Sequence, residues 1–268
     1  FGKNTDLEGK EIKWRNIRIK TENLEAERMQ GTLAPEVNRV PNYLTDAEKA
    51  DGWNLLFDGQ TTTGWRGAHK EAFPDHGWKV EDGQLIVLKS GGGESTNGGD
   101  IVTDKEYAAF ELSLEFKITP GANSGIKYFV TEAEKPSGSA YGLEYQILDD
   151  KLHPDAKLYT TTPGSRTLAS LYDMMPAGNK RFNGVGNWNQ AVLKVFPNNH
   201  VEHWLNGFKT LEYDRGSDAF RELVKGSKYA APSYNEAGRF GEAPQGHILL
   251  QDHGDEVAFR SIKIKELK

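Results

Sequence analysis

Short runs in which hydrophobic and polar residues alternate recur from residue 53 to the end of the chain. Alternation with a period of two is typical of half-buried strands, and turn residues such as Asn206-Gly207 separate the runs. The pattern predicts strands at Trp53–Phe57, Gly77–Val80, Gln84–Leu88, Phe110–Ile118, Gly125–Val130, Leu143–Leu148, Ala191–Phe196, His200–Leu205, Phe208–Tyr213, Gly246–Gln251 and Val257–Ile264.

Two short helices interrupt these strands. The first is expected from Thr45 to Gly52, because Thr45 followed by Glu48 forms a capping box. The second is expected over Asp218–Lys225, with Ser217 as its N-cap. So many strands with so few helices predict an all-β protein, either a sandwich or a barrel.

The two ends of the chain carry similar alternating segments, Gly9–Lys20 and Gly254–Lys265, with glycine, glutamate, arginine and isoleucine at the same offsets. We interpret the first copy as the closing strand of a preceding, related domain; convergence on a simple alternating pattern is the alternative. The predicted organisation is a leftover closing strand plus linker over residues 1–42 and a main domain over residues 43–268. Since Phe1 is not an initiator methionine, we expect further sequence upstream.

Composition excludes several classes of protein. The chain has 33 Lys and Arg against 39 Asp and Glu, a net charge of −6, and no block of basic residues, which argues against a nucleic-acid partner. The absence of cysteine excludes disulfides, thiol catalysis and zinc fingers. No apolar stretch approaches the ~18 residues that a membrane span requires.

Several predicted strands carry polar side chains on one face. A concave sheet that presented these side chains would form a polar binding groove; an ordinary solvent-facing sheet surface is the alternative, and alternation alone does not decide between them. The residues concerned are Glu115, Lys127, Glu144, Gln146, Gln251 and His253.

The segment Glu144–Asp150 is similar to the strand motif of laminarinase-type retaining glycosidases, in which carboxylates two residues apart line a groove. Gln146 stands where that motif has its middle acid. Retention through a covalent intermediate needs two carboxyl groups about 5–5.5 Å apart, so double displacement is not expected.

Two loops are candidate ligand-binding sites by composition. Asp149, Asp150, His153 and Asp155 form an acidic loop that could hold a divalent ion, but their spacing fits no standard metal loop and a solvated turn is favoured. The glycine-rich stretch over residues 91–99 lacks the residues of a phosphate-binding loop, and we expect a mobile loop near the rim of the groove.

A set of short motifs follows in a characteristic order: Leu56-Phe57-Asp58-Gly59 with Gly64-Trp65, Asn123-Ser124-Gly125-Ile126, Leu143 to Asp150 with His153-Pro154-Asp155, Leu171-Tyr172-Asp173, Gly186-Asn187-Trp188-Asn189, His200 to Gly207, and Leu250 to Gly254 with Phe259-Arg260. Together they resemble the 3-keto-disaccharide hydrolase family over residues 53–268. Trp14-Arg15-Asn16-Ile17 resembles the closing strand of the same family, which is consistent with an upstream tandem domain.

The resemblance implies a concanavalin-like jelly roll of two antiparallel sheets, with the catalytic domain at residues 43–268, in a secreted or periplasmic bacterial protein. It also implies cleavage of glycosides that carry a ketone at C3. A ketone acidifies the C2 proton, so a base can remove it, the C1 substituent leaves by β-elimination, and water then adds. A non-catalytic, lectin-like carbohydrate-binding module is the alternative, because the same fold serves both.

Elimination needs a base, a proton donor for the leaving group and a group that stabilises the enolate. Glu144 and His253 are the candidate base and acid, in either order. Lys127, and Arg260 if a bulge turns it to the groove, are the candidates for stabilising the enolate. A divalent ion that polarises the ketone is the one cofactor left open, with no ligands assigned. The residues expected to bind substrate are Glu115, Gln146, Gln251, Arg260 (if a bulge turns it to the groove), Tyr172 and His203.

Overall fold

The computed structural model describes residues 38–132, 138–234 and 238–268. The chain divides into two units, residues 1–37 and 38–268, and the second unit is the one described below. The expected closing-strand copy at Gly9–Lys20 therefore lies outside the described residues. Asn42 belongs to the second unit through two hydrogen bonds, since its side chain donates to the Gly83 carbonyl and accepts from the Ser261 amide.

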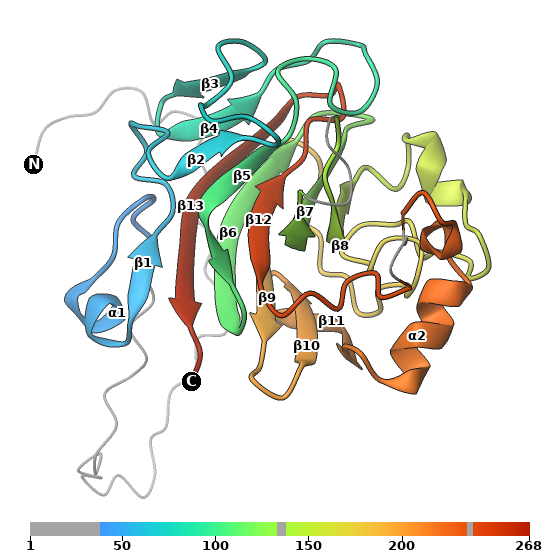
Figure 1. The fold of residues 1–268 in the computed structure, drawn as a ribbon. Coiled ribbons are helices and arrows are strands. Elements are labelled where there is room, and N and C mark those ends of the chain that lie inside the picture. Colours follow the sequence, from blue (N-terminus) through green and yellow to red (C-terminus); the bar gives the residue numbers. More distant parts are fainter. Residues whose placement is uncertain (1–37, 133–137, 235–237) are drawn as a thin grey trace, which may run out of the picture. The chain divides into compact units, whose positions relative to one another are not determined.

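Two antiparallel sheets form the body of this unit (Figure 1). The large sheet has the order β11 (Phe208–Asp214), β10 (His200–Leu205), β9 (Asn189–Val195), β6 (Phe110–Ile118), β13 (Val257–Glu266), β4 (Gln84–Val87) and β3 (Trp78–Glu81), with β1 (Trp53–Leu55) also paired to β13. The small sheet has the order β2 (Trp65–Gly67), β5 (Ile101–Tyr107), β12 (Gly246–Leu250), β7 (Asn123–Thr131) and β8 (Tyr141–Leu148).

The helices are short, as predicted. In α1 (Asp46–Ala50) Thr45 and Glu48 form the expected capping box, and Ser217 caps α2 (Asp218–Lys225). Two 3₁₀ turns, η2 (Pro154–Lys157) and η3 (Lys228–Ala230), lie in the connections. No helix within the described residues has the length and hydropathy that spanning a bilayer would require.

The predicted fold class is confirmed, and so is each predicted strand, with ends shifted by a few residues at most. The strands β2 and β5 were missed. Alternation does not reveal β2 because it is only three residues long, and the middle of β5 carries the exposed, charged Asp104 and Lys105, which interrupt its apolar pattern. Both strands belong to the small sheet, so alternation predicted all the strands of the large sheet but not all those of the small one.

The strand periodicity decides what enters the core. On β7 and β8 the residues that point toward the large sheet are apolar and join the buried cluster: Ile126, Tyr128, Tyr145 and Ile147. Their neighbours Lys127, Glu144 and Gln146 point away from it, yet they are also buried. The segment around Leu171 pairs with the free edge of β8, since the Ala169 amide donates to the Gln146 carbonyl and the Tyr172 amide donates to the Glu144 carbonyl. Burial of charged groups on an outer sheet face is costly and marks this region for closer inspection.

Candidate active site

A hollow opens on the outer face of the small sheet, over β7, β8 and the end of β12. It has two adjoining compartments that share the side chains of Glu94, Glu144 and Lys228. The carboxamide compartment is completed by Asn123, Gln146, Tyr172, Gln251 and His253. The tyrosine compartment is completed by Lys127, Ala140, Tyr141, Gly142, Tyr229 and Tyr234.

Glu144 lies on the wall between the two compartments. It pairs across the sheet with Lys127, only 4% of its surface is exposed, and no described residue donates a hydrogen bond to its carboxylate. Burial raises its pKa to about 7, against the opposing effect of the Lys127 and Lys228 ammonium groups. A carboxyl group with this pKa can both accept and return a proton near neutral pH.

The ammonium group of Lys127 is fully engaged. It donates to Glu94 Oε1 at 3.0 Å, to Ser139 Oγ at 3.0 Å and to the Ala140 carbonyl at 3.3 Å. Burial disfavours its charge, but the carboxylates of Glu94 and Asp100 raise its pKa above the ordinary value. Because an ammonium group has three hydrogens, Lys127 has none left for a substrate in this arrangement.

The glycine-rich loop lies at the rim, as expected, and brings Glu94 into the site. Its backbone is attached to the end of β12: the amides of Ser90 and Gly91 donate to the Gly254 carbonyl, and Asn97 and Gly99 donate to Asp252 Oδ2. Glu94 was not among the predicted site residues, because the density of glycine indicates a loop but does not distinguish the one carboxylate in it.

Three carboxamides face the hollow with unsatisfied atoms. Within the part of the chain that the structure describes, Asn123 Oδ1, Gln146 Nε2 and Gln251 Oε1 have no hydrogen-bond partner, although these residues are only 2%, 1% and 3% exposed. The other ends of two of them are fixed, because Gln146 Oε1 accepts from the Ile147 amide and Gln251 Nε2 donates to Glu94 Oε1. Buried polar atoms without partners are costly, so one donor and two acceptors are available here for a polar ligand such as a sugar.

Lys228 is the second residue of the hollow that was not among the predicted site residues. Its amide donates to Asp173 Oδ2 at 2.7 Å, and its ammonium group lies 4.4 Å from the ring centre of Tyr172 and 5.1 Å from that of Tyr229. Burial lowers its pKa below the ordinary value, although the Glu144 and Glu94 carboxylates oppose this effect. Nothing in the local sequence, Ser227-Lys228-Tyr229, distinguishes it from a surface lysine.

Most of the predicted site residues are brought together: Glu144, Lys127, Gln146, Gln251, Tyr172 and His253 all line the hollow. The Tyr172 hydroxyl donates to Asp155 Oδ2 at 2.8 Å. The ring of His253 lies 6.2 Å from that of His153, nearly perpendicular to it.

Three expected substrate-binding residues lie elsewhere, which corrects the predicted groove. Glu115 and Arg260 belong to the large sheet, where they form an ion pair at 2.9 Å, and the Arg260 guanidinium lies 4.0 Å over the Trp188 ring. A bulge does follow Arg260, but it leaves this ion pair on the outer face of the large sheet. His203 is fully buried in the core, where it contacts the Tyr128 hydroxyl at 2.8 Å.

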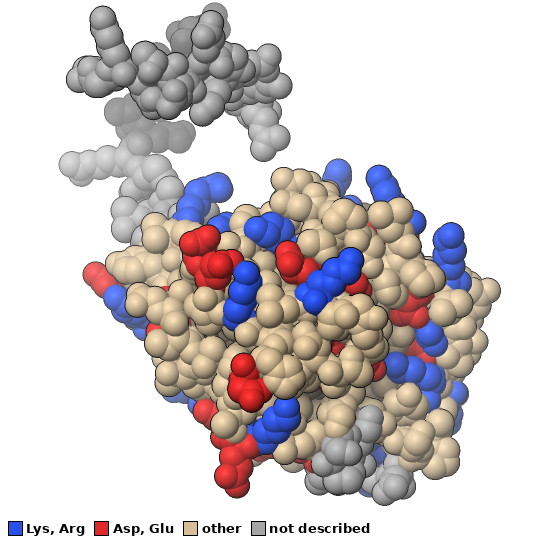
Figure 2. All heavy atoms as spheres, turned by 90° about the horizontal axis from the view of Figure 1, so that it is seen from above, with Lys and Arg blue, Asp and Glu red and all other residues tan. Residues whose placement is uncertain are grey.

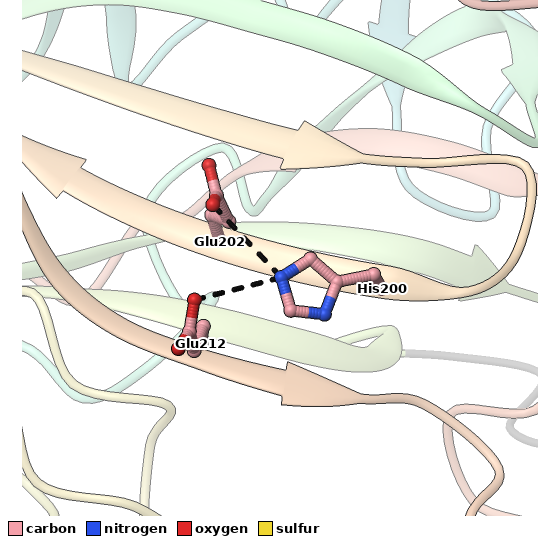
Figure 3. A group of neighbouring side chains, drawn as sticks. All are labelled: His200, Glu202 and Glu212. Carbon is pink, nitrogen blue, oxygen red and sulfur yellow. Dashed lines mark ion pairs between the residues drawn. The ribbon is translucent and has the colours of Figure 1, made fainter.

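The candidate metal-binding groups lie outside the hollow. In the acidic loop, Asp149 and Asp150 accept hydrogen bonds from the backbone amides of Gly121 and Leu168. Asp149 is buried, so this part of the loop is a hydrogen-bonded structural turn and not the solvated turn that we expected. Among the described residues, His200, Glu202 and Glu212 could converge on an ion, with ligand atoms within 4.8 Å of one another (Figure 3). They lie on β10 and β11 of the large sheet, and Lys209 already pairs with both carboxylates.

Charge on the surface gives no competing site on the face shown in Figure 2, where Lys and Arg side chains are interspersed with Asp and Glu. Elsewhere on the described surface, charged side chains form ion pairs, among them Lys263 with Glu48 and Lys265 with Asp51. The hollow, in contrast, is lined by the unsatisfied atoms of three buried carboxamides, which makes it the candidate site for a polar ligand.

Comparisons with known proteins show the family to which the chain belongs. Residues 52–265 match the family described as a 3-keto-alpha-glucoside-1,2-lyase-like domain. A curated 3-keto-disaccharide hydrolase of Bacteroides thetaiotaomicron is 38% identical over 236 residues, which cover 81% of this chain and 79% of that protein. A crystal structure of a candidate glycosyl hydrolase from Parabacteroides distasonis superposes with a TM-score of 0.72 at 32% identity, covering 85% of this chain and 100% of that chain. A second one from the same organism gives a TM-score of 0.58 at 27% identity, covering 80% of this chain and 99% of the other.

Proposed function

The chain belongs to the 3-keto-alpha-glucoside-1,2-lyase-like family, and from this premise we propose that it cleaves 3-keto-glycosides by β-elimination followed by hydration. The observation that carries the proposal is the Glu144 carboxyl group, which is buried between the two compartments, has a pKa of about 7 and accepts no hydrogen bond from a described residue. A carboxylate in this state is a suitable base for a carbon acid.

The reaction uses the ketone at C3 of the substrate. Glu144 removes the C2 proton, and the electron pair of the C–H bond moves toward the C3 oxygen to give an enolate. The enolate then expels the glycosidic oxygen at C1. This oxygen keeps the electron pair of the broken C1–O bond and must be protonated, and the remaining sugar ring is an enone. Addition of water, with hydroxyl at C1 and hydrogen at C2, completes a net hydrolysis. A second carboxylate is not required, which agrees with the presence of Gln146 at that position.

The lining of the hollow supports an orientation of the substrate. We assign Glu144 as the base and His253, in the carboxamide compartment, as the proton donor to the leaving oxygen. The leaving sugar then lies over Asn123, Gln146 and Gln251, whose unsatisfied atoms match hydroxyl groups. The 3-keto sugar ring then extends past Glu144 toward the tyrosine compartment.

The test is mass spectrometry of the products formed in deuterated water. The pure protein is incubated with a 3-keto-glucoside and, in parallel, with the same unoxidised glucoside, each with and without a chelator. Release from the 3-keto compound alone, with deuterium at C2, is the expected result, and chelator sensitivity reports whether a divalent ion takes part. Release from neither compound, with binding retained, would identify a lectin-like binding module instead.

A further inference from the structure

Two lysine ammonium groups lie at the hollow, and only one of them has hydrogens available. The three hydrogens of Lys127 are donated to Glu94, Ser139 and Ala140. The side chain of Lys228, in contrast, donates no hydrogen bond to any residue that the structure describes, although it lines both compartments. The charge near Glu144 that can still reach a ligand is therefore that of Lys228.

Aromatic rings hold the Lys228 ammonium group in place without using its hydrogens. Its nitrogen lies 4.4, 5.1 and 5.7 Å from the ring centres of Tyr172, Tyr229 and Tyr234. Cation–π contacts of this kind stabilise the charge through the ring faces. No carbonyl, carboxylate or hydroxyl oxygen among the described residues accepts a hydrogen bond from this ammonium group, so a ligand oxygen in the hollow can do so.

The backbone of Lys228 is fixed by a buried aspartate. Asp173 is 1% exposed and accepts the Lys228 amide at 2.7 Å, Arg166 Nε at 2.8 Å and the Thr160 hydroxyl at 2.6 Å. Asp173 adopts a φ of +59°, a conformation that non-glycine residues seldom take unless surrounding contacts impose it. Such support preorganises the lysine, which is what stabilisation of a transient negative charge requires.

We infer that Lys228 is the catalytic residue that stabilises the enolate oxygen at C3, in the role for which the sequence favoured Lys127. This inference rests on the function proposed above. Lys228 shares the compartment wall with Glu144, so base and cation act on adjacent carbons of the same ring. As the C2 proton moves to Glu144, the C3 oxygen gains the negative charge and accepts hydrogen bonds from the ammonium group, which keeps its proton. No covalent bond to the enzyme forms.

The experiment compares the wild type with Lys228→Met and with a control, Lys225→Met, which removes an exposed lysine of α2. Turnover of a 3-keto-glucoside and exchange of its C2 proton with deuterium are both measured. We expect Lys228→Met to lower kcat by about 10²–10³-fold, the usual effect of losing one oxyanion donor, with a smaller change in KM. Lys225→Met should behave as the wild type.

A purely structural role is distinguished by chemical rescue. Ethylammonium ions should restore, in a saturable manner, part of the turnover and of the C2-proton exchange that Lys228→Ala loses. If Lys228→Met does not fold, Lys228→Gln takes its place in the comparison. Wild-type-like turnover in a folded Lys228 variant would overturn the inference, as would a covalent substrate adduct on Lys228 after treatment with cyanoborohydride. Inactivity of the wild type itself would instead contradict the proposed function.

Discussion

A Cβ atom on Gly125 would lie 2.3 Å from Glu144 Oε1 and 2.9 Å from Glu144 Cδ. The two residues lie on neighbouring strands, β7 and β8, where Gly125 pairs with Gln146 and Lys127 pairs with Glu144. The Glu144 carboxyl group therefore extends over the sheet surface into the space that a side chain at position 125 would fill. The missing side chain of a glycine thus sets the position of the proposed base.

Gly125→Ala should impair catalysis more than folding. The new methyl group meets the end of a flexible side chain, so Glu144 can move aside at modest cost, but its carboxyl group leaves its position. We expect kcat on a 3-keto-glucoside to fall at least about 10²-fold, with the melting temperature changed by a few degrees at most. The matched control is Gly93→Ala in the rim loop, where an added Cβ meets no atom within 4 Å. Equal activity of the two variants would contradict the proposed placement of the base.

Glu144→Gln should abolish turnover and change how stability depends on pH. The folded-state pKa is raised to about 7 from 4.5, so the folded protein binds more protons than the unfolded chain between these values. The contribution of Glu144 to stability is thus fully present below pH 4.5 and is lost as pH rises through about 7. The free energy of unfolding of Glu144→Gln, relative to that of the wild type, should therefore increase by up to about 3 kcal/mol between pH 4.5 and pH 8.

Urea unfolding of both proteins at pH 4.5, 6 and 8 measures this difference directly. Wild-type kcat/KM should rise with pH through about 7, because only the carboxylate can act as the base. A stability difference that is independent of pH would show that this carboxyl group titrates normally.

His253→Ala should have an effect that depends on the leaving group. If His253 protonates the leaving oxygen, its loss matters most for a sugar alcohol, which leaves poorly as an anion, and least for p-nitrophenolate, which leaves without a proton. We expect a loss of about 10²-fold or more on a 3-keto-disaccharide and less than about 10-fold on the 3-keto p-nitrophenyl glucoside. Glu144→Gln, measured in parallel, should lose both activities. An equal loss on both substrates in His253→Ala would assign that histidine another role.

His203 should make the fold sensitive to acid. Burial lowers its pKa to about 3, while the unfolded chain takes up the proton near 6.5, so the stabilising effect of the neutral ring is present above pH 6.5 and decreases as pH falls. The decrease is about 1.4 kcal/mol per pH unit. We expect His203→Gln to be less stable than the wild type at pH 7.5. The difference in free energy of unfolding between the two proteins should be about 2 kcal/mol smaller at pH 5. If urea unfolding gives the same difference in free energy at both pH values, protonation of His203 is not a cause of acid sensitivity.

The sequence determined every strand except β2 and β5, the helix caps, and the sheet face on which Lys127, Glu144 and Gln146 lie. These features are local: a period of two assigns side chains to faces, and a capping box needs only residues three positions apart. For the same reason alternation could not assign a strand to a sheet. Glu115 satisfied the same pattern as Glu144, yet it lies in the other sheet, paired with Arg260.

Only the tertiary structure decided which charges meet. Glu94 reaches Lys127 because its loop is hydrogen-bonded to Asp252 and Gly254, more than 150 residues away. Lys228 reaches the same hollow through its backbone contact with Asp173. Such contacts depend on the packing of distant segments and on the burial that shifts their pKa values, and neither leaves a periodic signal in the sequence.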